Sequence, residues 1–405
     1  MSTRGEAMLA LRRQRMAAAI PFLRGGFRPF FFGGAAWGLI ALTLWLFALP
    51  GALALPTQFD PLAWHRHEML FGFVGAVVAG FLLTAIPNWT GRLPIAGKPL
   101  AVLFSLWAAA RMAVLFSAEI GAVPAALLDV GFFAVLAGVT GREVLAAKNR
   151  NLPVVGIILL LGLACALDHA AAAGLLSRPD SGWQAATATV VLLISLIGGR
   201  IIPSFTRNWM AKQGITRGLP QQPGRFDLLA IALTAGALLA WIALEPGPLS
   251  AGLLAAAAAL QAARLARWSG WRTAPDPLVL ILHVGYAWVP AGLLLLALSE
   301  AGMSVPQSAA VHAVTAGAMA TMILGVMTRA TLGHTGRALQ AGGATVAIYG
   351  LVTAGALLRV AAPLGYVDYT LGMRASALVW GAALLLFLIA YGPILWRARV
   401  GDAAG

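Results

Sequence analysis

The sequence predicts an all-α, polytopic integral membrane protein with about twelve transmembrane helices. Of its 405 residues, 60% are hydrophobic and only 10% are charged, whereas ordinary soluble domains have roughly 45–50% apolar and 25% charged residues. Apolar runs of about 20 residues, the length that a helix needs to cross a bilayer, recur along the whole chain. This pattern excludes a soluble globular protein.

The apolar runs are separated by clusters of glycine, proline and charged residues, which set the expected helix ends. The second and tenth runs are interrupted by polar side chains. The expected spans are 28–50, 64–88, 99–118, 122–146, 152–173, 183–204, 226–244, 249–267, 277–298, 307–331, 341–361 and 371–396. We therefore expect a basic cytoplasmic arm at 1–27, a single transmembrane domain at 28–396 and a short cytoplasmic tail at 397–405.

The positive charge predicts the orientation of the chain. The formal net charge is +14, yet it is scattered through apolar sequence, which disfavours nucleic-acid binding. Counted by loop, 20 lysines and arginines fall on one side and only Arg178 on the other. Because cytoplasmic loops retain positive charge, both termini are expected in the cytoplasm. Seven arginines fall within spans or at their ends: Arg28, Arg66, Arg111, Arg200, Arg329, Arg359 and Arg374.

The N-terminal arm and the single cysteine limit which targeting signal and which metal ligands are expected. The arm lacks an apolar core followed by a small-residue cleavage site, so it is not read as a signal peptide; a surface helix on anionic lipid is expected. Cys165 is the only cysteine, which excludes a disulfide framework and a thiolate metal cage. A bound transition metal is expected to use histidine, methionine or carboxylate ligands.

Ionisable groups inside spans are costly and mark candidate functional sites. The segment 64–69 (WHRHEM) brings two imidazoles, a guanidinium, a carboxylate and a thioether into the outer end of the second span. His65 and Met69 are four residues apart and share a helix face, whereas His65 and His67 point apart. One metal ion held by both histidines is therefore disfavoured, and interfacial histidines beside Trp64 remain an alternative.

The other histidines fall at two expected depths. His312, in the tenth span, is expected near the outer level of His65 and His67. His169 is expected there too, but with Asp168 it is interpreted as interfacial. His283 and His334 are expected closer to the cytoplasm, where His283 is either part of a second site or a hydrogen-bonded core histidine.

Three cytoplasmic helix ends resemble one another: 84–92 (TAIPNWTGR), 199–208 (GRIIPSFTRN) and 327–337 (MTRATLGHTGR). They close the second, sixth and tenth spans. A four-helix unit repeated three times would give that spacing.

Several of these motifs together resemble the NnrS family. The resemblance rests on 27–31 (FRPFF), 64–73 (WHRHEMLFGF), 85–91, 199–206, 283–288 (HVGYAW), 325–329 (GVMTR) and 333–337 (GHTGR), in order along nearly the whole chain. The family consists of bacterial inner-membrane proteins that contain haem and copper and take part in the nitric oxide response. The resemblance thus implies haem b, copper, nitric oxide as ligand and a multi-pass protein of the cytoplasmic membrane, acting in denitrification or nitrosative stress.

Joined with the expected depths, the resemblance suggests a role for each candidate residue. The expected axial haem ligands are His67 and His312, which would approach opposite faces of the ring. The copper candidates are His65, Met69, His283 and His334. Residues expected to contact a propionate or to orient a ligand are Arg66, Glu68, Tyr286 and Arg329.

The reaction itself is not defined by the sequence, and neither a catalytic residue nor an electron donor is identified. Haem ligands on the second and tenth of twelve helices resemble those of haem-copper oxidases, but the further histidines that those enzymes carry on the middle helices are absent. Two alternatives remain: a transporter of a metal or small metabolite, and a membrane cytochrome that only transfers electrons.

Overall fold

The computed structural model describes residue 14 and residues 18–401. Most of the expected N-terminal arm, and residues 402–405 of the expected tail, lie outside the described residues. Within them, the chain forms helices joined by loops and no strand, which confirms the all-α prediction.

Twelve segments of the described chain are long and apolar enough to cross a membrane. Each coincides with one expected span, with ends that shift by up to eight residues, the largest shift being at the end of the sixth span. They are Phe27–Ala48, Pro61–Thr90, Lys98–Leu115, Ala122–Ala146, Leu152–Ala172, Ser181–Lys212, Arg225–Ala243, Pro248–Ala266, Pro277–Glu300, Gln307–His334, Gly343–Ala361 and Tyr369–Trp396. The protein is therefore a multi-pass membrane protein.

The chain divides into two compact units. Unit 1 is the described part of Met1–Ala186, Ala330–Ala338 and Leu388–Gly405, and unit 2 is Thr187–Arg329 with Leu339–Phe387. Helices α9 (Ser181–Leu193), α15 (Ala320–His334) and α17 (Tyr369–Trp396) each contain a boundary between the units. The expected single domain over 28–396 stays a prediction.

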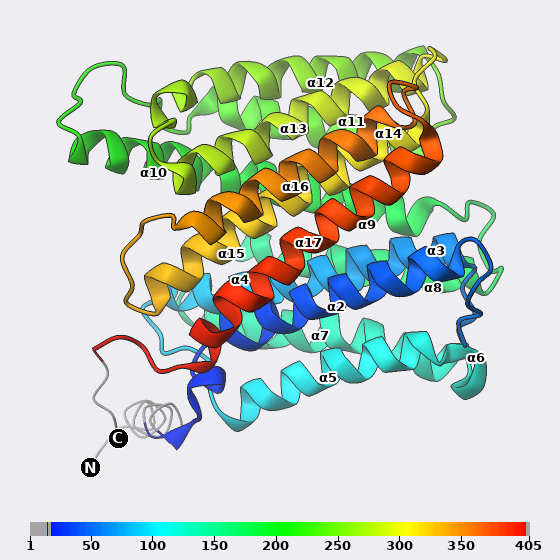
Figure 1. The fold of residues 1–405 in the computed structure, drawn as a ribbon, viewed down its shortest axis with the longest axis horizontal. Helices are drawn as coiled ribbons and strands as arrows, with labels where there is room; N and C mark the ends of the chain where they lie inside the picture. The colour runs from blue at the N-terminus through cyan, green and yellow to red at the C-terminus, as the bar shows by residue number, and fades with distance from the viewer. Residues whose placement is uncertain (1–13, 15–17, 402–405) are drawn as a thin grey trace. The chain divides into compact units, whose positions relative to one another are not determined.

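Unit 1 contains the first five spans (Figure 1). They are α2 (Phe27–Ala48), the continuous run of α3 (Pro61–His67), η2 (Glu68–Val74) and α4 (Gly75–Thr90), then α5 (Lys98–Leu115), α7 (Ala122–Ala146) and α8 (Leu152–Ala172). The short helix α6 (Ser117–Ile120) joins α5 to α7. Helix α2 packs on α4, and α7 packs on both α5 and α8.

The start of α3 is defined by its first residues. The Asp60 carboxylate accepts hydrogen bonds from the backbone N–H groups of Leu62 and Ala63, and Pro61 occupies the first helical position, where its missing N–H costs nothing. This cap starts the helix at Pro61, six residues before His67. It therefore sets the position of the segment 64–69.

Unit 2 contains the seventh, eighth, ninth and eleventh spans and most of the sixth, tenth and twelfth. Its helices are η3 (Ile194–Gly198), α10 (Gly199–Lys212), α11 (Arg225–Ala243), α12 (Pro248–Ala266), η4 (Gly270–Thr273), α13 (Pro277–Glu300), α14 (Gln307–His312), η5 (Ala313–Met319) and α16 (Gly343–Ala361). Helix α12 packs between α11 and α13.

Three spans widen from α-helix to π-helix, at η2, η3 and η5. These are the second, sixth and tenth spans, whose predicted cytoplasmic ends resemble one another in sequence. A π-turn leaves carbonyl groups that side chains can reach: Trp107 Nε1 donates to the Gly72 carbonyl, and Arg264 Nη1 donates to the Ser195 carbonyl. The recurrence supports the predicted three-fold repeat.

Arg264 forms a hydrogen-bonded network inside unit 2. Its Nε donates to Asp227 Oδ1 at 2.7 Å, and its Nη1 donates to the Tyr286 hydroxyl at 2.9 Å. Tyr286 donates in turn to Gln261, whose amide reaches the Ser195 hydroxyl. Because the guanidinium is buried and paired with a carboxylate, the network holds α11, α12 and α13 together without leaving an uncompensated charge.

Gly199→Ala is expected to lower the free energy of unfolding by about 1–3 kcal/mol, the usual cost of overpacking a core. A Cβ atom at Gly199 would overlap the Arg264 guanidinium and displace it from Asp227. Gly236→Ala is the matched control in the same unit, because a Cβ there meets no atom and the helix propensity of alanine is higher. Equal melting temperatures for the two variants would contradict this packing.

Candidate functional site

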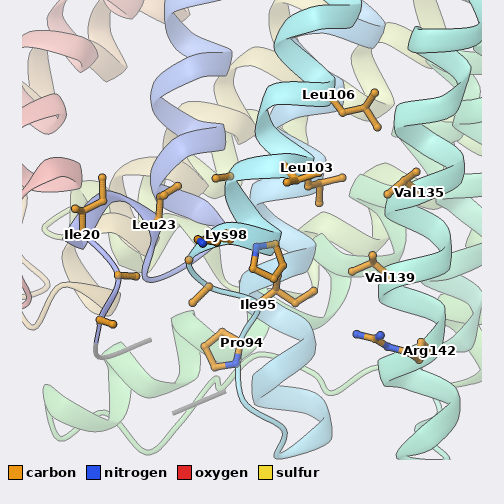
Figure 2. A pocket seen from close by; sticks show the side chains of 17 residues that line it. Ile20, Leu23, Pro94, Ile95, Lys98, Leu103, Leu106, Val135, Val139 and Arg142 are labelled. Carbon is orange, nitrogen blue, oxygen red and sulfur yellow. The ribbon is translucent and has the colours of Figure 1, made fainter. Parts of the chain in front are cut away.

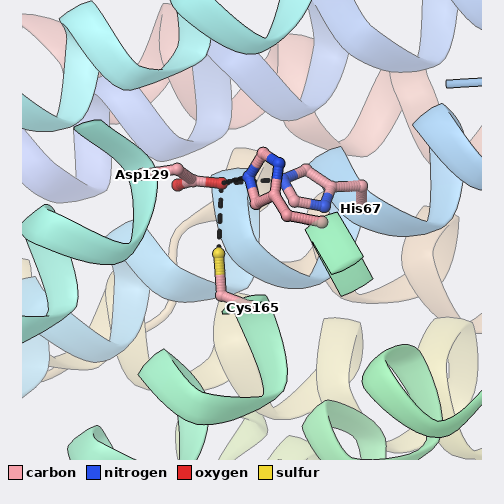
Figure 3. Close-up of side chains that lie close together, drawn as sticks. His67, Asp129 and Cys165 are labelled. Carbon is pink, nitrogen blue, oxygen red and sulfur yellow. Dashed lines mark hydrogen bonds and ion pairs between the residues drawn. The ribbon is translucent and has the colours of Figure 1, made fainter. Parts of the chain in front are cut away.

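A cluster of four metal-ligating side chains lies inside unit 1. We call it the His67 cluster: His67, at the end of α3, with Asp129 of α7 and Cys165 and His169 of α8. One ligand atom from each residue lies within 4.8 Å of the others. Figure 3 shows His67 and Cys165 both directed toward the Asp129 carboxylate. Three different spans therefore meet at one group of potential ligands.

Asp129 is the centre of this cluster. Its Oδ2 atom lies 2.7 Å from His67 Nε2, 3.2 Å from His169 Nε2 and 3.2 Å from Cys165 Sγ. Its Oδ1 atom accepts a hydrogen bond from Arg111 of α5. A carboxylate is an acceptor only, so each of these neighbours donates to it.

His67 is held at both ring nitrogens. While Nε2 faces Asp129, Nδ1 lies 2.8 Å from Asp168 Oδ2. Both partners are carboxylates, so both nitrogens donate and the ring carries two protons in this arrangement. A carboxylate on the far nitrogen of a histidine is also the arrangement that orients metal-bound imidazoles.

Arg111 links the His67 cluster to a second buried carboxylate. Its Nη1 donates to Glu68 Oε2 at 2.8 Å, and Trp37 Nε1 donates to the same oxygen at 2.5 Å. The second oxygen, Glu68 Oε1, is buried and has no hydrogen-bond partner among the described residues. Arg111 thus compensates two carboxylates within the membrane span.

The surroundings of the His67 cluster are apolar on one side and ionic on the other. The rings of Phe59 and Phe71 lie 4.7 and 4.9 Å from the His67 ring. Toward the predicted outer surface, Arg66 pairs with Asp180 at 3.1 Å, and Trp183 donates to the same carboxylate. The side chains of His67 and Asp129 are fully buried. The cluster is therefore shielded from bulk solvent.

Comparison with known protein families assigns the chain to one of them. The model of the NnrS family, described as "NnrS protein", matches residues 21–399. The chain belongs to the NnrS family. This membership supports a general role as a membrane protein of the nitric oxide response. No curated protein matches the chain.

Within this NnrS protein, the two histidines of the segment 64–69 have different surroundings, as their spacing predicts. His67 faces the cluster, whereas the ring of His65 stacks on Trp45 at 4.1 Å. Glu68 contacts Arg111 and Trp37 and not an imidazole. Arg66 faces Asp180 at the predicted outer surface, and Met69, two residues beyond His67, is half-buried.

The remaining predicted residues of unit 2 lie in separate places. His283 Nε2 bonds to the Thr206 hydroxyl at 2.8 Å, Tyr286 belongs to the Arg264 network, and the Arg329 guanidinium lies over the Phe205 ring. His312 Nδ1 lies 2.7 Å from the Ser308 carbonyl.

The candidate His334, at the end of the tenth span, belongs to unit 1. Its ring lies 5.6 Å from the ring of Phe27. The His334 ring therefore packs against the start of α2. The candidates His283 and Arg329, by contrast, contact Thr206 and Phe205 of α10 in unit 2.

Two expectations are corrected by the structure. His169 and Asp168 are buried in unit 1 and not at the interface, because the α8 face that carries them packs on α7 and α3. Cys165 does not exclude a site with one sulfur ligand, since its Sγ lies in the His67 cluster.

Asp129 was missed although a signal for it exists in the sequence. It is the lone carboxylate within the apolar run 122–138, and an ionisable residue there is a functional candidate by default. Its partner Arg111 stands in the preceding span. Pairing these two intramembrane charges would have placed a site between the third and fourth spans.

Proposed function

We propose that this NnrS protein holds copper at the His67 cluster and haem at His312, and that it binds or removes nitric oxide. The observation that carries the proposal is the convergence of two imidazoles, one thiol and one carboxylate within 4.8 Å. Two histidines and one cysteine with a weaker fourth ligand are typical of copper sites. His67, which the resemblance implies as an axial haem ligand, is thus proposed as a copper ligand instead.

The donor atoms of the His67 cluster suit a single ion. Bonds of about 2.0–2.3 Å in a tetrahedral arrangement separate ligands by about 3.3–3.8 Å, which falls within the observed spread. The ion would replace the proton on His67 Nε2 and the proton on Cys165, while the Nε2 proton of His169 would move to Nδ1 of the same ring and so free the Nε2 lone pair. Exchanging two protons for a divalent cation leaves the buried net charge unchanged, and so the carboxylates need no new partner.

The surrounding residues would position the ligands. Asp168 keeps the Nδ1 proton of His67 and so directs Nε2 toward the centre. Arg111 holds Asp129 through Oδ1 and leaves Oδ2 for the centre. When bound, copper would supply one-electron chemistry and affinity for nitric oxide, while the buried site excludes bulk water.

For haem, the residues around His312 offer a proximal ligand and a cation. The Nδ1 atom of His312 donates to the Ser308 carbonyl, which leaves the Nε2 lone pair for iron, as in proteins with a proximal histidine. Arg359 interacts electrostatically with His312 from the packed helix α16. Its buried Nη1 has no hydrogen-bond partner among the described residues and would suit a propionate.

The proposal is tested by the copper and haem contents of His67→Ala and His312→Ala. We expect His67→Ala to lose copper and keep the Soret band, and His312→Ala to lose the Soret band and keep copper. His334→Ala is the control and should keep both. Loss of the Soret band in His67→Ala would restore the axial pair His67 and His312, and a colourless, copper-free wild type would favour a transporter.

Electron transfer alone remains the second candidate, because a buried site with two histidines and one cysteine is also typical of copper proteins that only exchange electrons. Addition of nitric oxide to the reduced protein separates the two functions. A shifted haem or copper spectrum supports direct binding, whereas an unchanged spectrum supports electron transfer.

Copper(II) binding to the metal-free protein is expected to release about two protons, because a metal ion displaces the protons of its ligands. These protons leave His67 Nε2 and Cys165 Sγ, so copper affinity should rise with increasing pH. Calorimetric titration in buffers of different ionisation heats measures the number released. A binding heat that is independent of the buffer would contradict this exchange.

A further inference from the structure

An apolar groove lies over the seam between α5 and α7 of unit 1. Its volume is about 1160 Å³, larger than the roughly 300–1,000 Å³ of most small-molecule pockets. Its apolar walls are formed by Leu103, Leu106, Val135 and Val139. Figure 2 shows Leu106 at one end of the groove and Arg142 at the other.

Two exposed cations line the same groove. Lys98, at the start of α5, forms no ion pair with any described residue. Arg142, near the end of α7, donates to Glu143 Oε1 at 3.0 Å, but its side chain remains 64% exposed. Glu143 is also paired with Arg92. Among the described residues, the cations Lys98, Arg142 and Arg92 therefore stand against the carboxylate of Glu143 at this end, and their summed charge is positive.

The depth of the groove matches one leaflet of a bilayer. Lys98 and Arg142 both belong to the predicted cytoplasmic side, whose lipids carry the negative charge. From Lys98 to Leu106 the helix rises about 12 Å, which is most of the roughly 15 Å half-thickness of the hydrocarbon core. The cations thus stand at headgroup level and the apolar walls at the level of acyl chains.

Two segments of the chain close the groove at its cytoplasmic end. The loop Pro94–Gly97 and the segment Ala18–Leu23 close its cytoplasmic end, and the two are joined by the hydrogen bond from the Gly97 N–H to the Leu23 carbonyl. Val102 of α5, by contrast, is 69% exposed and lines the groove toward the membrane. The groove is open to lipid and bounded on its aqueous side.

We propose that this groove binds one anionic phospholipid of the cytoplasmic leaflet. The phosphate lies between Lys98 and Arg142, and an acyl chain follows Leu103 and Leu106 toward the middle of the membrane. Two cations at headgroup level beside an apolar groove select a lipid that carries a net negative charge. This site is separate from the His67 cluster and does not depend on the function proposed for it.

Native mass spectrometry of the full-length protein, released from bilayers of phosphatidylcholine with phosphatidylglycerol, tests the proposal. We expect one phosphatidylglycerol to be retained in preference to phosphatidylcholine. The double variant Lys98→Gln/Arg142→Gln should lose this preference by about fivefold for each cation removed. Lys148→Gln/Arg150→Gln is the matched control, because it removes two exposed cations that do not line the groove.

A second variant separates a bound lipid from general attraction to charge. Val135→Trp should fill the lipid-facing wall of the groove and expel the phospholipid without changing any charge. Retention of phosphatidylglycerol by Val135→Trp, an equal loss in the control, or equal retention of the two lipids by the wild type would each overturn the proposal. Binding of neither lipid to the wild type would do the same.

Discussion

Arg111→Met is expected to lower the free energy of unfolding by about 3–5 kcal/mol, the usual cost of removing one partner from a buried ion pair. The side chain is almost fully buried and compensates both Glu68 and Asp129. Methionine fills a similar volume, so the loss isolates the charge. Without the guanidinium, two carboxylates remain in the membrane interior.

Reversible unfolding in mixed detergent micelles measures this loss. Arg66→Met is the matched control, since it removes a guanidinium from a partly exposed pair with Asp180, where about 0–1 kcal/mol is expected. The triple variant Arg111→Met/Glu68→Gln/Asp129→Asn should recover part of the stability, because it removes the uncompensated charges. Equal stability of Arg111→Met and the wild type would show that the charges are not buried as described.

Cys165→Ser is expected to weaken copper binding by more than the roughly 10–100-fold that follows loss of an outer hydrogen-bond partner of a metal ligand. The substitution removes the only thiolate while a hydroxyl of similar size can still donate to Asp129. The fold should therefore persist. Copper per protein, measured by plasma mass spectrometry after dialysis, gives the result.

Two further variants test whether copper binding depends on the orientation of His67 and on the place of the site in the fold. Asp168→Asn keeps all four ligand atoms and weakens only the orientation of His67, so its copper affinity should fall by about 10–100-fold. His283→Ala removes a buried histidine outside the His67 cluster and should keep full copper content. If His283→Ala loses copper while Cys165→Ser keeps it, the copper site lies in unit 2 and the assignment is wrong.

The membrane spans could be predicted from the sequence because each one must be an apolar run long enough to cross the hydrocarbon core, whatever its neighbours are. A run such as 122–146 needs no knowledge of its neighbours to be recognised. The different surroundings of His65 and His67 followed from helical spacing for the same reason. The π-helical segments were not predicted, since their widened turns depend on partners such as Trp107 and Arg264 from other helices.

The members of the His67 cluster could not be grouped from the sequence because they are brought together by packing. His67 and Asp129 stand 62 residues apart, and nothing local connects them. The neighbouring Asp168 and the Ala-rich stretch around His169 predict an interfacial residue, although the exposure of His169 depends on which face of α8 packs on α7. A single cysteine excludes a cage of several thiolates, whereas one sulfur among two imidazoles is sufficient for copper.

X-ray absorption at the copper edge of the purified wild-type protein tests the copper assignment most directly. The account predicts one sulfur and two imidazole neighbours of the copper, with the sulfur lost in Cys165→Ser and one imidazole lost in His169→Ala. A copper ion with no sulfur neighbour in the wild type, or with a neighbour set unchanged by both substitutions, would contradict it.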